Sequence, residues 1–130
     1  MYEKIEELLK NKNILIVEDE ISLLEIMAES IEEYVHRIFK AKNGIEGLEV
    51  FQSKNIDLII SNIHMAKMTG LRMSHEIRKF DPHIPIIFLT AYDTDENMLE
   101  AIEVKSRNVL KKPFDKKQLL VSMMLAMNSF

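Results

Sequence analysis

Four short apolar segments of this sequence each lead into a polar side chain, and this arrangement constrains the fold more than any other feature. The segment Leu58 to Ser61 reads as a strand buried on both faces, and Asn62 follows it. Functional groups collect at the carboxyl ends of parallel strands, because the loops there vary without disturbing the core. The polar residues that end or follow the other three segments are Glu18 with Asp19, Thr90, and Lys111 with Lys112.

The apolar segments alternate with amphipathic stretches along the chain, which predicts an α/β fold. Right-handed crossovers between the strands then give a doubly wound parallel sheet with helices on both faces. Five strands are expected, at Ile14–Glu18, Arg37–Ala41, Leu58–Ser61, Ile86–Thr90 and Asn108–Leu110. The five expected helices run from Ser22 to Val35, Ile45 to Gln52, Gly70 to Phe80 and Asp95 to about Val104, and onward from Asp115.

Three of these helices begin with a recognisable capping signal. A polar side chain at the helix start, with a Glu or Gln three residues later, satisfies backbone N–H groups that have no partner inside the helix. The pairs with this spacing are Ser22 with Glu25, Asn43 with Glu46, and Asp115 with Gln118.

The first residues, Tyr2 to Lys10, predict a short amphipathic helix ahead of the domain. Ile5, Leu8 and Leu9 have helical spacing among Glu and Lys residues. This apolar stripe packs either on its own domain, which is the interpretation we favour, or on a partner. We therefore assign residues 1–11 to the helix and residues 12–130 to the domain.

The bulk composition excludes several classes of protein. The 130 residues are enough for one domain and leave no room for a second, output domain. A net charge of −4 gives no electrostatic reason to expect nucleic acid as a partner. No apolar run is long enough to span a membrane. The sequence lacks cysteine, which is compatible with the reducing cytoplasm that we expect.

The four segment ends together carry a family resemblance. Glu18-Asp19, the strand that leads into the residues MAKMTG, Thr90-Ala91 and Lys112-Pro113-Phe114 resemble the receiver domain of two-component response regulators. The resemblance extends from about Asn13 to Phe130. It implies the flavodoxin-like strand order 2-1-3-4-5, which periodicity does not supply.

The resemblance also implies a role for each polar residue. Asp19 would hold Mg²⁺ directly, Glu18 would act through water, and the backbone carbonyl of His64 would be a further ligand. Thr90 would hydrogen-bond the phosphoryl group, and Lys112 would pair with an acid at rest and with phosphoryl oxygen afterwards. Without the resemblance, the acids would read as helix-start residues and Thr90 as the end of a strand.

Asn62 departs from the family pattern at the decisive position. In the family an aspartate stands there, accepts the phosphoryl group and helps to hold the cation. A carboxamide is a poor nucleophile and brings no charge. We therefore expect no phosphorylation at Asn62, weak or absent Mg²⁺ binding, and a more stable metal-free domain.

Four further positions near the site bear on the comparison with the family. Lys111 is expected to point away from the pocket because strand side chains alternate, and the resemblance implies a cis peptide between Lys112 and Pro113. The family usually has an aromatic residue where this chain has Val109, and a proline where it has Ala66. Together with Asn62, the departures at Val109 and Ala66 suggest a receiver that has drifted from phosphate control.

Three functional hypotheses follow. The first is a receiver-type signalling module, not an enzyme, that receives signals from a histidine kinase or a phosphotransfer protein. It would bind an effector through its fourth helix, fifth strand and fifth helix, as a monomer or weak homodimer. The second is an ordinary Mg²⁺-dependent receiver whose aspartate was replaced in the laboratory. The third, a small Mg²⁺-dependent phosphatase-like enzyme, lacks an obvious nucleophile or base.

Overall fold

The computed structural model describes residues 2–91 and 108–128 and contains one five-stranded parallel sheet. The strand order is β2-β1-β3-β4-β5, which confirms the predicted order. The register pairs Ile14 with Leu58 across β1 and β3, and Asn62 with Leu89 across β3 and β4. The strands are β1 (Asn13–Val17), β2 (Arg37–Ala41), β3 (Leu58–Asn62), β4 (Ile86–Thr90) and β5 (Asn108–Lys111).

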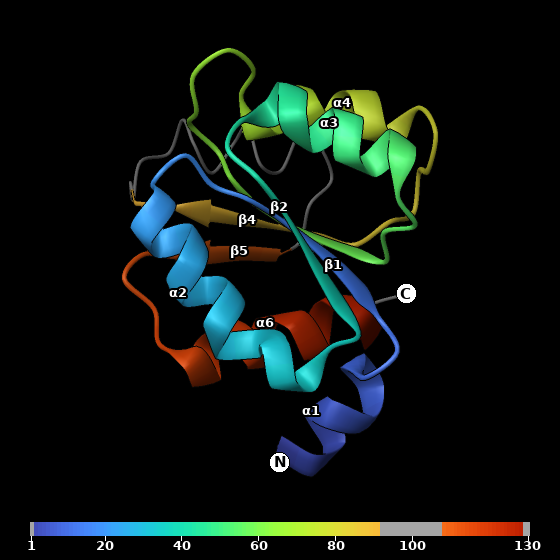
Figure 1. Cartoon of the computed structure of the whole chain (residues 1–130), viewed down its shortest axis with the longest axis vertical. Coiled ribbons are helices and arrows are strands. Elements are labelled where there is room, and N and C mark those ends of the chain that lie inside the picture. Colours follow the sequence, from blue (N-terminus) through green and yellow to red (C-terminus); the bar gives the residue numbers. More distant parts are fainter. Residues whose placement is uncertain (1, 92–107, 129–130) are drawn as a thin grey trace.

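Helices cover both faces of this sheet (Figure 1). Helices α3 and α4 lie together on one face, whereas α1, α2 and α6 lie on the other. The α-helices are α1 (Tyr2–Leu9), α2 (Ile21–Ile31), α3 (Gly44–Ser53), α4 (Gly70–Arg78) and α6 (Lys116–Asn128), and the 3₁₀ turn η1 (Glu32–Tyr34) follows α2. The helix expected from Asp95 to about Val104 lies outside the described residues.

The strands are apolar on both faces because each face has its own core. In β1, Ile14 and Ile16 pack toward α1, α2 and α6, whereas Leu15 and Val17 pack toward α3 and α4. Side chains alternate between the two faces of a strand, so a central strand with helices on both sides needs an unbroken apolar run. This requirement explains why the central strands could be recognised from the sequence.

Two of the predicted helix caps are confirmed. The Asn43 side chain accepts a hydrogen bond from the Glu46 N–H at 2.9 Å, and α3 begins at the next residue, Gly44. At the start of α6, the Asp115 side chain accepts from the Gln118 N–H at 2.8 Å, and the Gln118 side chain accepts from the Asp115 N–H at 2.9 Å. Each cap satisfies N–H groups that the helix itself leaves without a partner.

The capping box predicted for Ser22 and Glu25 is wrong. Helix α2 already begins at Ile21, its N-cap is Glu20 without a side-chain cap, and Glu25 forms an ion pair with Lys40 at 3.0 Å. The helix also ends at Ile31, before the predicted Val35. Its buried residues are Leu24, Met27, Ala28 and Ile31, while Ile26 is 60% exposed.

The N-terminal helix packs on its own chain, as the favoured interpretation predicted. Ile5 and Leu9 are fully buried in the core cluster that includes Ile14, Met27 and Leu120. No helix within residues 2–91 and 108–128 has the length and apolar character needed to cross a membrane.

Candidate functional site

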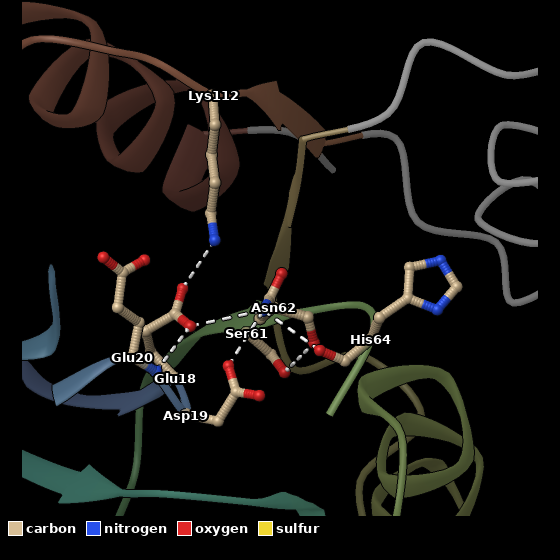
Figure 2. A network of polar contacts seen from close by, with 7 residues as sticks. All are labelled: Glu18, Asp19, Glu20, Ser61, Asn62, His64 and Lys112. Carbon is tan, nitrogen blue, oxygen red and sulfur yellow. Dashed lines mark hydrogen bonds and ion pairs between the residues drawn. The ribbon is translucent and has the colours of Figure 1, made fainter. Parts of the chain in front are cut away.

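The predicted polar residues meet at the carboxyl edge of the sheet (Figure 2). Glu18 and Asp19 directly follow β1, Asn62 ends β3, and Lys112 follows β5. Lys112 approaches Glu18 from above in Figure 2, and His64, whose backbone carbonyl accepts from the Asn62 side-chain amide, lies to the right. The parallel register places these strand ends next to one another although up to 94 residues separate them along the chain.

Glu18 is a carboxylate with no exposed surface, and three donors compensate for its burial. Its Oε1 accepts from the Lys112 ammonium at 2.8 Å, and its Oε2 accepts from the Glu20 N–H at 3.1 Å and from the Asn62 amide at 3.2 Å. Burial raises the pKa of Glu18 and neighbouring Asp19 adds to this, while Lys112 and the Glu20 N–H act in the opposite direction. The ion pair therefore neutralises a charge that burial alone would make costly.

The Asn62 side chain lies in the middle of this cluster. Besides its contact with Glu18, its Nδ2 donates to Asp19 Oδ1 at 3.4 Å and to the His64 carbonyl oxygen at 3.1 Å. The structure thus brings together the groups that the resemblance assigned to the cation. The amide nitrogen of Asn62 lies between oxygens of Glu18, Asp19 and His64. The imidazole of His64 points away from the cluster (Figure 2), and His64 contacts Asn62 through its backbone carbonyl.

Thr90 and Lys112 are neighbours at the adjoining strand ends. Thr90 is 3% exposed, and its carbonyl oxygen accepts from the Lys112 N–H at 2.8 Å. Lys111 is exposed, in agreement with the alternation of strand side chains. The Lys112–Pro113 peptide is cis, as the resemblance implied.

Two residues that support Asn62 were missed in the sequence. The buried hydroxyl of Ser61 donates to the Asn62 carbonyl oxygen at 2.9 Å. A Cβ at Gly70 would collide with that same carbonyl oxygen, so only glycine fits where α4 begins. The chain contains only three glycines, and this scarcity was a signal that each one has a structural purpose.

The loop after β3, which contains Ala66, includes one residue with an unusual backbone conformation. Lys67 adopts a φ of 68°, a left-handed conformation that costs a non-glycine residue energy. The Met68 carbonyl oxygen accepts from the Gly44 N–H at 3.1 Å, which ties this loop to the start of α3. Val109 is half-buried in β5.

The groups around Asn62 match the ligands of a divalent cation only in part. Two carboxylates and a backbone carbonyl are oxygen ligands of the kind that Mg²⁺ prefers. However, the Asn62 side chain presents N–H donors to those same oxygens, and it brings no charge. Within the described residues no cluster of three or more His, Cys, Asp and Glu side chains could hold a metal. As arranged here, the residues do not fit the cation.

Comparison with known proteins places this arrangement in a family. Residues 14–124 match the response regulator receiver domain. The transcriptional regulatory protein ZraR of Klebsiella oxytoca is 37% identical over 116 residues, which cover 88% of this chain and 26% of ZraR. The chain thus spans about a quarter of the length of this relative.

Solved structures share the fold. The chemotaxis protein CheY4 of Vibrio cholerae is 27% identical with a TM-score of 0.84, over 89% of this chain and 98% of that one. A response regulator receiver domain protein from Clostridium thermocellum is 28% identical with a TM-score of 0.82, over 90% of this chain and 94% of that one. The family match, these folds and the converging strand ends agree that this chain belongs to the response regulator receiver domain family.

Proposed function

We propose that this chain is a receiver-type signalling module that works by binding proteins and does not accept a phosphoryl group at Asn62. Receiver domains interact with histidine kinases or phosphotransfer proteins and with effector domains, and they typically bind Mg²⁺ at the phosphorylation site. One observation supports the departure from that pattern. The side chain at the end of β3, surrounded by Glu18, Asp19 and the His64 carbonyl, is a carboxamide.

The chemistry of the carboxamide is the reason for this proposal. Phosphoryl transfer to a receiver needs a side-chain oxygen that attacks phosphorus, and a carboxylate provides one. The amide nitrogen of Asn62 shares its lone pair with the carbonyl group and is a weak nucleophile. Its N–H groups are also engaged with three acceptors. The Asn62 side chain therefore forms hydrogen bonds that hold the site together, but it does not provide an acceptor for a phosphoryl group.

The proposed partners are those with which receiver domains interact. We propose that a histidine kinase or a phosphotransfer protein recognises the domain, and that an effector binds a face that includes β5 and α6. The fourth predicted helix, expected to end near Val104, was assigned to this face from the family resemblance and lies outside the described residues. We propose that the protein acts in the cytoplasm, as a monomer or weak homodimer, without turning over a substrate and without binding nucleic acid directly.

Intact mass after incubation with acetyl phosphate and Mg²⁺ tests the proposal. We expect no phosphoryl adduct on the unchanged chain and an adduct on the Asn62→Asp variant, because Asp19, Thr90 and Lys112 would then surround a competent acceptor. Asn128→Asp is the matched control, since it adds an aspartate at an exposed position of α6. An adduct on the unchanged chain that maps to Asn62 would refute the proposal.

The same experiment addresses two other outcomes. If neither the chain nor Asn62→Asp gains an adduct, the pocket has lost more than its acceptor, and a binding role alone remains. If Asn62→Asp gains an adduct as fast as an ordinary receiver does, an ordinary phosphate-accepting receiver whose aspartate was replaced becomes the better description. The natural codon at position 62 then decides between a replacement in the laboratory and one in nature.

A further inference from the structure

The Asn62 amide nitrogen lies where oxygens from two different loops converge (Figure 2). Glu18 Oε2 lies 3.2 Å from it, Asp19 Oδ1 lies 3.4 Å from it, and the His64 carbonyl oxygen lies 3.1 Å from it. The nitrogen has two hydrogens for these three acceptors, so one N–H is shared. The longest contact, to exposed Asp19, is the weakest of the three.

The neighbours also fix which way the amide points. The opposite orientation would place Oδ1 against two carboxylate oxygens and a carbonyl oxygen, none of which can donate a hydrogen bond. The observed orientation instead gives a donor to the buried Glu18 carboxylate. Turning the Asn62 oxygen inward would therefore cost these hydrogen bonds and add repulsion between oxygens.

The spacing of the oxygens suits a nitrogen rather than a metal ion. Mg²⁺ holds its ligands at about 2.0 to 2.1 Å in near-octahedral geometry. The three oxygens here surround a central nitrogen at 3.1 to 3.4 Å. The contacts to Glu18 and to the His64 carbonyl have the usual length of an N–H···O hydrogen bond, and the contact to Asp19 is slightly longer. A cation at this centre would require each oxygen to move inward by about 1 Å.

The charges agree with this geometry. Lys112 pairs with Glu18 at 2.8 Å, so these two charges cancel, and Asp19 is the remaining charged group that contacts the Asn62 amide. Asp19 is exposed, and water solvates its carboxylate. The cluster therefore needs no further positive charge to be stable.

From these observations we infer that the Asn62 amide replaces the divalent cation, so that the receiver site is complete without metal. This inference rests on the proposed function, because it explains how a receiver that lacks an acceptor holds its acidic loops together. Asn62 then connects the loops after β1 and β3 through its side-chain hydrogen bonds. If Asn62 were instead a weak metal ligand, shortening its side chain would change the Mg²⁺ affinity in the opposite direction.

The Asn62→Ala variant separates the two roles by the sign of its effect. If the Asn62 oxygen were a metal ligand, its removal would weaken Mg²⁺ binding. If the amide replaces the cation, its removal frees Glu18, Asp19 and the His64 carbonyl, and Mg²⁺ binding becomes tighter. We expect a gain of about tenfold in affinity over the unchanged chain, corresponding to the loss of one hydrogen bond to a charged group.

A Mg²⁺ titration followed by nuclear magnetic resonance measures this difference. The backbone amide of Glu20 reports the site, because it donates to Glu18. We expect the resonance to shift at millimolar Mg²⁺ in Asn62→Ala and in Asn62→Asp, and to remain in place at the same concentrations in the unchanged chain and in an Asn128→Ala control. Weaker binding by Asn62→Ala than by the native chain would overturn the inference.

The side-chain NH₂ of Asn62 gives a second test that needs no variant. Its two hydrogens should give separate resonances that exchange slowly with water and are insensitive to millimolar Mg²⁺. A saturable shift of these resonances on adding Mg²⁺ to the native chain would overturn the inference even if Asn62→Ala does not fold. The acetyl phosphate experiment is independent of both, since an adduct on the native chain would refute the proposed function whatever the affinity for Mg²⁺.

Discussion

The side chain at position 62 determines how many negative charges the loops after β1 and β3 must hold. In the native chain the Asn62 amide donates to Glu18 and to Asp19. An aspartate at position 62 would replace both attractive contacts by repulsion between carboxylates. Each pair of like charges near 4 Å costs roughly 1 to 4 kcal/mol between the limits of bulk water and protein surface.

We therefore predict that Asn62→Asp lowers the free energy of unfolding by about 1 to 4 kcal/mol in the presence of EDTA. Mg²⁺ should restore much of this loss in the variant and change little in the native chain. Urea unfolding with and without Mg²⁺ measures both effects. Equal stability of variant and native chain in EDTA, with no better Mg²⁺ binding by the variant, would contradict the prediction.

The pKa of Glu18 gives a second prediction at the residue scale. Burial raises it above the ordinary value of 4.5, so between 4.5 and the raised value the folded chain binds more protons than the unfolded chain. The contribution of Glu18 to stability therefore increases as the pH falls through this window and decreases as the pH rises. Glu18→Gln cannot ionise and should lack this dependence.

Unfolding by urea at several pH values between about 4.5 and 7.5, in EDTA, measures the difference between native chain and Glu18→Gln. As the pH falls, the native chain should gain stability relative to the variant. Glu29→Gln, at an exposed position of α2, is the matched control for replacing a glutamate by a glutamine. A difference that moves the other way for Glu18→Gln would mean that Lys112, rather than burial, dominates the pKa.

The residue types of the site could be predicted from the sequence, but their contacts could not. An apolar parallel strand followed by a polar residue places that residue at the carboxyl edge of the sheet, which is why Asp19, Asn62 and Lys112 were found. The direction of the Asn62 amide depends on oxygens that come from a different strand. Ser61 was missed because a serine inside an apolar run gives no indication of which carbonyl it contacts.

For helices and strands, periodicity predicted the central residues of each element better than the residues at which the element begins and ends. The strands β2 and β4 match their predicted bounds because both are short runs with clear limits. Helix α2 was predicted less well, since Ser22 has the composition of a cap but lies inside the helix. Several residues near a helix start can cap it, and the path of the preceding loop determines which one does.

The connection from α4 to β4 supports a prediction at this scale. The guanidinium of Arg78 donates through Nη1 to the carbonyl oxygens of Pro82 and Ile84, and burial lowers its pKa. We predict that Arg78→Met, which keeps an unbranched apolar stem but removes the guanidinium donors, costs roughly 1 to 3 kcal/mol because two carbonyls lose their partner. Urea unfolding measures this loss.

Arg72 on the same helix provides a matched control. Its side chain is 68% exposed and lies 3.9 Å from Glu76, so Arg72→Met should change the stability by no more than about 0.5 kcal/mol. Similar losses for Arg72→Met and Arg78→Met would mean that the carbonyl contacts do not stabilise the connection.

For the whole molecule, the alternation of strands and helices predicted the class, and the resemblance supplied the strand order. Periodicity cannot order five parallel strands, because each central strand has the same apolar pattern. The order matters for function, since it places β1 between β2 and β3 and brings Glu18 next to Asn62. The family match begins at residue 14, so α1 precedes it.

Helix α1 nevertheless belongs to the same core as the sheet. Ile5 and Leu9 are fully buried, Tyr2 lies 6.0 Å from the Tyr34 ring in η1, and Lys116 of α6 lies 5.1 Å over that ring. A helix of eight residues is not stable alone in water, so these contacts hold it in place. In return, Ile5 and Leu9 cover apolar surface of the core that the rest of the chain would otherwise expose.

We predict that Ile5→Ala and Leu9→Ala each lower the free energy of unfolding of the whole domain by about 2 to 5 kcal/mol, the usual cost of such a cavity in a core. Glu7→Ala, at an exposed position of α1, should change it by no more than about 0.5 kcal/mol. Calorimetry and near-ultraviolet circular dichroism should record one shared transition at a lower temperature for the two core variants. A separate early transition, with the main transition unmoved, would mean that α1 is an appendage and that the receiver core is complete without it.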